Sequence, residues 1–203
     1  MRAETWGLIS ASIVALSAIP YALNTWAGKA KPNLTSWSLW SVIGFALLVT
    51  YRDSRANSNL WPAWFGLINP TCITILAIIR HNKLEPMTFW EKLSVIGCIA
   101  SLALWYKVQD NKDLAQFALY LAIAADMCAA IPTFVFVLHS PHEDRPGPWI
   151  LFAVGYLVSL LAITDHTFSN YILPLYMGFG TLAIAWILAV YRFRQRSPIR
   201  QWI

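Results

Sequence analysis

Asp126 is the residue of this sequence best placed to do chemistry, because it is the only acidic or basic side chain deep inside a long apolar run, residues 114–142. A charge at the centre of a bilayer costs roughly 2.5–3.5 kcal/mol, so such residues are commonly functional. We expect Asp126 to face the interior, protonated or hydrogen-bonded by a neighbour such as Asn69, and to bind solute or protons. The structural alternative is a neutral Asp that joins two helices by one hydrogen bond.

Three further side chains could line a binding site at membrane depth. Asn69 precedes Pro70, so its amide could bind solute or could instead occupy a carbonyl that the proline leaves free. Tyr176 could line a cavity or face lipid. Trp40, in the segment Ser36-Trp37-Ser38-Leu39-Trp40, is typical of an interfacial anchor and could alternatively stack on a flat substrate.

A polar cluster formed by His139, His142, Glu143 and Asp144 could in principle ligate a metal. Its neighbouring prolines favour a solvated connector instead. The sequence has no Walker loop, no Gly-x-Ser-x-Gly and no His-Glu-x-x-His. We therefore expect no enzyme activity, no metal and no cofactor, and we interpret the three cysteines as small hydrophobic residues: Cys72, Cys98 and Cys128.

The composition of the 203 residues, 58% hydrophobic and 12% charged, predicts an all-α integral membrane protein whose first partner is the lipid bilayer. Soluble domains carry roughly 25% charged residues, and a chain of this length has no core large enough for so much apolar surface. Runs near the roughly 20 residues that cross a bilayer predict seven transmembrane helices, over residues 5–28, 32–51, 56–79, 88–106, 114–142, 146–164 and 167–191. Thr88 and Glu91 predict a capping box at the fourth.

The net charge of +5 indicates membrane orientation rather than nucleic-acid binding. Ten Lys and Arg residues lie on the side of the C-terminus and of the loops after the first, third and fifth helices, against five on the other side. Cytoplasmic loops carry the excess of positive charge. We therefore expect an external N-terminus and a cytoplasmic C-terminus in a bacterial inner membrane.

An internal repeat at an offset of 112 residues organises the chain. Ala18-Ile19-Pro20 recurs as Ala130-Ile131-Pro132, Trp37 matches Trp149, and Arg80 matches Arg192. The repeat predicts two parallel three-helix units, residues 1–83 and 111–196, joined by a linker helix in residues 84–110 and followed by a tail, residues 197–203. Parallel repeats are related by an axis along the membrane normal, and a substrate site usually lies between them near the midplane.

The matched prolines, Pro20 and Pro132, each remove a backbone hydrogen bond and kink a helix. Their equivalent positions favour a pair of hinges that open one side, although proline is also simply tolerated in membrane helices.

This 3+1+3 arrangement, with paired prolines near the ends of the first and fifth helices, resembles the PQ-loop and SWEET superfamily of transporters. Pro20 is followed by Tyr21 and Pro132 by Thr133, so the Pro-Gln dipeptide of the family is absent and the resemblance is to a divergent branch. The group of features formed by segment 31–40, by Asp126 followed by Pro132-Thr133, and by segment 141–144 looks like that of a group of bacterial seven-helix membrane proteins.

The resemblance also implies where a solute would bind. Sugar-carrying SWEETs have an Asn on each of the third and seventh helices that faces the central cavity. Here Asn69 has Thr181 as its repeat mate, so only half of that pair is kept, which argues against sugar.

We expect a SWEET-like carrier of a small solute, with its site at the repeat interface. The alternative is an accessory subunit of a membrane complex without transport activity, and either could form a homo-oligomer. A wet central cavity that touches Asn69 and Asp126 favours the carrier, whereas a dry interface favours the subunit. The expected substrate-binding residues are Asn69, Asp126, Thr181, Tyr176 and Trp40.

Overall fold

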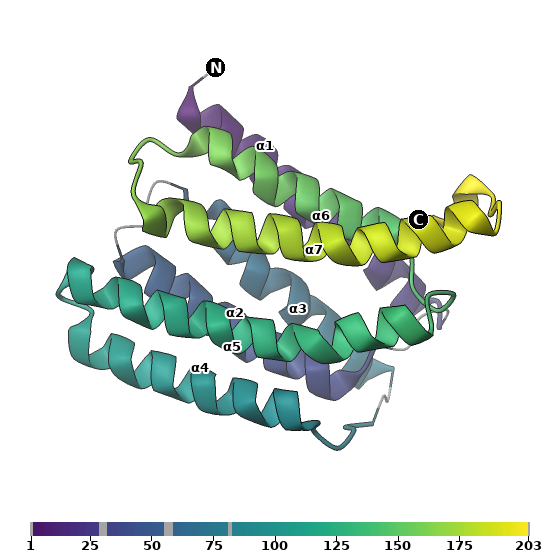
Figure 1. Cartoon of the computed structure of the whole chain (residues 1–203), viewed down its shortest axis with the longest axis horizontal. Coiled ribbons are helices and arrows are strands. Elements are labelled where there is room, and N and C mark those ends of the chain that lie inside the picture. The colour runs from purple at the N-terminus through teal and green to yellow at the C-terminus, as the bar shows by residue number, and fades with distance from the viewer. Residues whose placement is uncertain (1, 29–31, 55–58, 81–82, 203) are drawn as a thin grey trace.

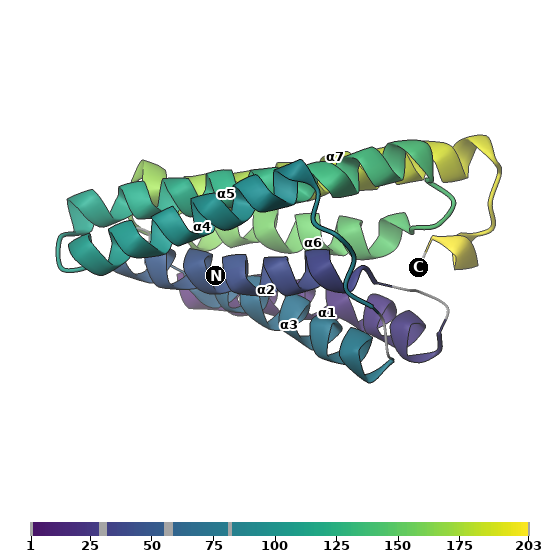
Figure 2. The same cartoon turned by 90° about the horizontal axis from the view of Figure 1, so that it is seen from below.

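The structure is a computed structural model that describes residues 2–28, 32–54, 59–80 and 83–202. Across these residues it has seven α-helices, two short 3-10 helices and no strand, and the α-helices run side by side along the long axis (Figure 1, Figure 2). The α-helices are α1 (Ala3–Trp26), α2 (Leu34–Asp53), α3 (Trp61–Ile79), α4 (Phe89–Val108), α5 (Lys112–His139), α6 (Pro146–Ser159) and α7 (Phe168–Arg194).

Five of these helices, α1, α2, α3, α5 and α7, are long and apolar enough to cross a membrane. The helix α6 is shorter than predicted, because it ends at Ser159 and continues only as the 3-10 helix η1 (Leu160–Ala162). The helix α4 carries Glu91 and Lys92 in its first turn and Lys107 in its last turn, and these charges lower its mean hydropathy. The five apolar helices are compatible with an integral membrane protein.

The helices pack in the same order in the two parts of the chain. In the first, α3 packs against both α1 and α2, and in the second, α7 packs against both α5 and α6. The two parts meet where α1 packs against α6 and where α2 packs against α5. The helix α4 lies along α5 at the edge of the bundle (Figure 1).

Glycine allows two of these helix pairs to approach closely. A Cβ atom on Gly44 of α2 would lie 2.6 Å from the carbonyl oxygen of Gly66 on α3. A Cβ atom on Gly155 of α6 would lie 2.5 Å from Cγ2 and 3.0 Å from the backbone nitrogen of Val14 on α1. Small residues at helix interfaces allow the backbones to come together, and dispersion then holds them in a bilayer.

The linker helix α4 is fixed at its start by polar contacts. The predicted capping box is confirmed: Oγ1 of Thr88 accepts from the backbone N–H of Glu91 at 3.2 Å, and the Glu91 carboxylate accepts from the backbone N–H of Thr88 at 2.8 Å. The same carboxylate accepts from the hydroxyl of Ser36 on α2 at 2.7 Å. The start of α4 is therefore joined to the start of α2.

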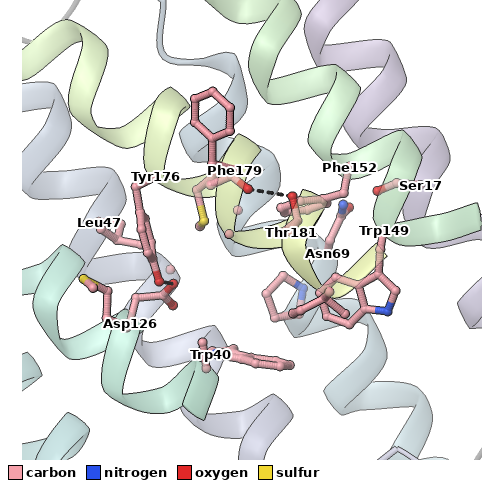
Figure 3. A pocket seen from close by; sticks show the side chains of 18 of the residues that line it. Ser17, Trp40, Leu47, Asn69, Asp126, Trp149, Phe152, Tyr176, Phe179 and Thr181 are labelled. Carbon is pink, nitrogen blue, oxygen red and sulfur yellow. Dashed lines mark hydrogen bonds between the residues drawn. The ribbon is translucent and has the colours of Figure 1, made fainter. Parts of the chain in front are cut away.

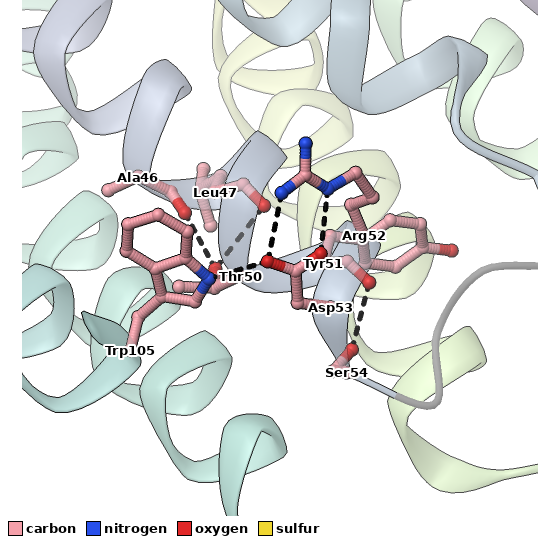
Figure 4. Close-up of polar contacts among 8 residues, drawn as sticks. All are labelled: Ala46, Leu47, Thr50, Tyr51, Arg52, Asp53, Ser54 and Trp105. Atoms are coloured by element: carbon pink, nitrogen blue, oxygen red, sulfur yellow. Dashed lines mark hydrogen bonds and ion pairs between the residues drawn. The ribbon is translucent and has the colours of Figure 1, made fainter. Parts of the chain in front are cut away.

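The other end of α4 is also joined to α2 (Figure 4). The indole Nε1 of Trp105 donates to Oδ2 of Asp53 at 2.8 Å, and Arg52 forms an ion pair with the same carboxylate. On its other side, α4 contacts α5 through Ser94 and Ser101, whose hydroxyls each donate to an α5 carbonyl at 2.7 Å. The helix α4 thus connects α2 to α5.

Candidate functional site

A cavity of about 950 Å³ lies between the first three helices and the last three (Figure 3). Its wall takes residues from all six of these helices. Cavities of roughly 300–1,000 Å³ hold small-molecule ligands in other proteins. The interface between the two parts of the chain is therefore hollow and large enough for a small solute.

All five side chains expected to bind solute line this cavity: Asn69, Asp126, Thr181, Tyr176 and Trp40. They come from α3, α5, α7 and α2, so the fold brings together residues up to 141 positions apart in the sequence, from Trp40 to Thr181. Their binding role stays a prediction, but their common location is a feature of the structure.

The carboxylate of Asp126 accepts a hydrogen bond from the hydroxyl of Tyr176 at 2.7 Å, and the Asp126 side chain is almost completely buried (Figure 3). The donor is therefore Tyr176 on α7, and not the suggested neighbour Asn69. The reason is helix packing, because α5 lies beside α7 whereas α3 lies beside α1. The bond joins two helices, as the structural alternative requires, and the residue lines the cavity, as the functional one requires.

Asn69 binds a different carbonyl from the one suggested by its proline neighbour. Its Nδ2 donates to the backbone oxygen of Val14 on α1 at 2.9 Å. Pro70 leaves the carbonyl of residue 66 without its usual partner, and the Asn69 amide does not go there. Thr181, the repeat mate of Asn69, donates to the carbonyl of Met177 in its own helix at 2.6 Å.

Aromatic rings form much of the remaining wall. The ring of Trp37 packs against Tyr21 at a centroid distance of 5.0 Å and edge-on against Trp40 at 5.3 Å. Trp149 and Phe152 of α6 line the cavity as well. The expected hinge residues lie beside this wall, Pro20 next to Tyr21 and Pro132 next to Ile131.

Four pairs of lining residues are related by the offset of 112. Trp40 pairs in this way with Phe152, a match that sequence identity missed because the ring type changes. The pair of Trp40 and Phe152 is found when residues at this offset are compared by chemical class instead of by identity. The four pairs are Ala18 with Ala130, Trp37 with Trp149, Trp40 with Phe152, and Asn69 with Thr181.

Where both partners are described residues, the hydrogen bonds between α1–α3 and α5–α7 lie on one side of the cavity. The hydroxyl of Tyr156 donates to the carbonyl of Pro62 at 2.9 Å, and the hydroxyl of Ser10 donates to the carbonyl of Gly155 at 2.9 Å. These contacts lie toward the N-terminal end of α1 and the C-terminal end of α6. The cavity extends toward the opposite side, where Trp37 and Trp149 stand one turn into α2 and α6.

The loop between α5 and α6 is held against the start of α6 and the end of α7 on this side. Trp149 Nε1 donates to Oδ2 of Asp144 at 2.9 Å, and Arg192 donates to the carbonyl oxygens of His142 and Asp144 at 3.0 and 2.9 Å. Burial raises the pKa of the Asp144 carboxyl, and the hydrogen bonds from the backbone N–H of Arg145 and from Trp149 oppose that rise. Within the described residues, no three His, Cys, Asp or Glu side chains are grouped to hold a metal.

Fold and site together define a helical protein with apolar, span-length helices and a central cavity between two similarly packed triplets. No protein-family model, curated protein or solved structure matches the chain. Its resemblance to the PQ-loop and SWEET superfamily therefore stays a prediction that depends on the residues quoted above.

Proposed function

We propose that this protein is a SWEET-like membrane carrier of a small solute, with the cavity as its solute site. The cavity is the observation that carries the proposal, because it is lined by both Asn69 and Asp126 and receives residues from six helices. An accessory subunit without transport activity was expected to have a dry, packed interface at this position. A space of about 950 Å³ favours the carrier.

Helix boundaries and helix packing support the proposed 3+1+3 arrangement. The helices α2 and α6 begin at Leu34 and Pro146, which are 112 residues apart. The helices α1 and α5 end at Trp26 and His139, within one residue of that offset. When α1, α2 and α3 are matched to α5, α6 and α7, the contact of α1 with α6 becomes the contact of α5 with α2. This exchange is what a two-fold axis between parallel repeats requires.

The matched arginines support the same correspondence. Arg192 of the second unit binds carbonyls of the loop after α5. Arg80 of the first unit reaches the loop after α1, where its Nη2 lies 3.0 Å from the place that a Cβ atom on Gly28 would occupy. Each arginine thus approaches the connection between the first and second helices of its own unit.

In a carrier, the two sides of the site open alternately. The hydrogen bonds between the two units on the N-terminal side correspond to a closed outer gate, and the cavity on the opposite side corresponds to an inner vestibule. With the excess of Lys and Arg in the cytoplasm, this vestibule faces the cytoplasm. Pro20 and Pro132, beside the vestibule wall, are the proposed hinges.

Cys128 lines the cavity and offers a direct test of access and orientation. In a Cys72→Ala/Cys98→Ala protein it is the single remaining thiol. We expect a membrane-impermeant thiosulfonate reagent to label it in inside-out vesicles and not in intact cells. The matched control keeps only Cys98, which is buried and should stay unlabelled from both sides. Lack of reaction from either side would support the accessory subunit, and labelling from outside would reverse the orientation.

Transport is tested by counterflow in proteoliposomes. Solutes that raise the melting temperature of the purified protein are first identified, because a ligand of the folded state stabilises it by mass action. Vesicles preloaded with an excess of an unlabelled hit should then accumulate the labelled hit transiently, and vesicles without protein should not. If no stabilising solute is exchanged, the carrier proposal is wrong.

A further inference from the structure

The described part of the cavity wall carries one acidic group and no basic one. Of the described residues that line it, Asp126 is the only one with a carboxyl, amine, guanidinium or imidazole side chain. The carboxylate lies on α5 and is held in place by Tyr176. A solute that neutralises a buried carboxylate must bring a positive charge or a proton, because an unpaired charge in an apolar site is costly.

Four polar donors of the wall are already engaged with the protein. The hydroxyls of Ser17 and Thr181 donate to the carbonyls of Val14 and Met177 at 2.6 Å each, and the Asn69 amide donates to Val14. The hydroxyl of Tyr176 donates to Asp126. An anion or a polyhydroxylated solute needs several donors, whereas this wall is mostly apolar and its one charged group is an acceptor. Among the described residues of the wall, the indole N–H of Trp40 and the hydroxyl of Tyr21 remain as donors toward a solute.

Aromatic faces complete the recognition chemistry. The quadrupole of an indole or phenol ring presents negative charge at its face and attracts cations, with about 0.5–2 kcal/mol for each well-placed ring. Tyr21, Trp37, Trp40, Trp149 and Phe152 all line the same cavity as Asp126, and Trp40, Trp149, Phe152 and Asp126 are labelled in Figure 3. Rings and carboxylate thus favour the same sign of charge.

We infer that the solute is a monovalent organic cation with an apolar body, its ammonium group at Asp126 and its body against the rings of α2 and α6. The inference rests on the proposal that the cavity is a solute site, and it names the chemical class that this site takes. One carboxylate balances one positive charge. The volume of about 950 Å³ accommodates a body the size of one or two aromatic rings.

Three probes of similar size and different charge test the inference: 4-phenylbutyltrimethylammonium, 4-phenylbutanol and 4-phenylbutyrate. Binding is measured as protection of Cys128 in the Cys72→Ala/Cys98→Ala protein against methyl methanethiosulfonate, a neutral reagent whose own access does not depend on charge. We expect the cation to half-protect Cys128 at a concentration at least about tenfold lower than the alcohol, with the anion weakest.

Asp126→Asn should bring the half-protecting concentration of the cation to within about threefold of that of the alcohol. Asp126→Glu keeps the carboxylate and should keep the preference for the cation. This control distinguishes an effect of the lost charge from an effect of misfolding. If the alcohol protects as well as the cation, if none of the probes protects at millimolar concentration, or if Asp126→Asn keeps the preference, the inference is wrong.

Counterflow of 4-phenylbutyltrimethylammonium separates this inference from the carrier proposal. Selective protection by the cation without exchange across the membrane would support the ligand class and refute the carrier. Exchange of neutral solutes by a protein without cation preference would support the carrier and refute the ligand class.

Discussion

Two groups of three helices, α1–α3 (the first unit) and α5–α7 (the second unit), each join their third helix to their first by a hydrogen bond, but with different chemical groups. In the first unit, a side chain of α3 reaches α1, where Asn69 donates to the backbone carbonyl of Val14 at 2.9 Å. In the second unit, a side chain of α7 reaches α5, where Tyr176 donates to the carboxylate of Asp126 at 2.7 Å. Val14 and Asp126 are 112 residues apart, so the third helix is joined to the same position of the first helix in both units.

The difference lies in which group accepts the bond. A backbone carbonyl serves in the first unit, and this leaves the Val14 side chain fully buried against Gly155. A carboxylate serves in the second, and this places an ionisable group in the cavity wall. The contact between the third and first helices is thus kept in both units, while the second unit alone gains an ionisable carboxyl group in the cavity wall.

The largest expected effect on stability comes from the close contact between α2 and α3 in the first unit. Gly44→Ala should lower the free energy of unfolding by about 3 kcal/mol, because its Cβ would lie 2.6 Å from the Gly66 oxygen and 2.9 Å from the Leu67 Cα, which are backbone atoms that move only with the helix. The change in the free energy of unfolding is measured by unfolding the protein in mixed detergent micelles.

The matched control is Gly180→Ala in α7, where a Cβ atom would meet nothing within 4 Å. This substitution should be neutral or stabilising by about 0.5–1 kcal/mol, the usual gain from alanine in a helix. Equal effects of Gly44→Ala and Gly180→Ala would show that the close approach of α2 and α3 does not contribute to stability.

The second prediction concerns the two equivalent hydrogen bonds. Tyr176→Phe leaves the buried Asp126 carboxylate without its donor and should cost about 2 kcal/mol, whereas Asn69→Leu should cost about 1 kcal/mol. The reason is that the Val14 carbonyl also accepts from Ser17. Double replacement, Asp126→Leu with Tyr176→Phe, should cost less than the sum of the single changes. The idea is refuted if Asn69→Leu is the more destabilising of the two.

Much of the fold could be predicted from the sequence, because apolar runs, capping residues and prolines act locally. The seven helices and the capping box at Thr88 are confirmed. The early end of α6 at Ser159 is an exception, because the run 146–164 is apolar throughout and composition alone does not show where a helix stops.

The sequence predicted five side chains that the structure places in the cavity wall, but it did not predict how they pair. Polar residues at membrane depth have few places to go, so Asn69 and Asp126 could be assigned to the interior. The partner of Asp126 depends on how α7 lies along α5, and Tyr176 is 50 residues away in the chain. Local sequence patterns do not reveal that register. The role of Gly44 and Gly155 is equally hidden, because a close approach of two helices becomes apparent only when both helices are placed.

The smallest expected difference is between the effects on stability of replacing the two matched arginines, Arg80 and Arg192. Arg192 is buried, with 8% of its surface exposed, and donates to two carbonyls of the loop after α5, whereas Arg80 is exposed at the end of α3. Arg192→Gln should therefore cost about 1.5 kcal/mol and Arg80→Gln less than about 0.5 kcal/mol, again by unfolding in mixed micelles. Arg192→Lys keeps the charge without the planar fork of donors, and we expect an intermediate loss in the free energy of unfolding.

If Arg80→Gln proves as costly as Arg192→Gln, the first unit fixes its loop as firmly as the second. The two units would then differ in stability only around Val14 and Asp126, so the asymmetry would be confined to the cavity wall and would not extend to the loops after α1 and α5.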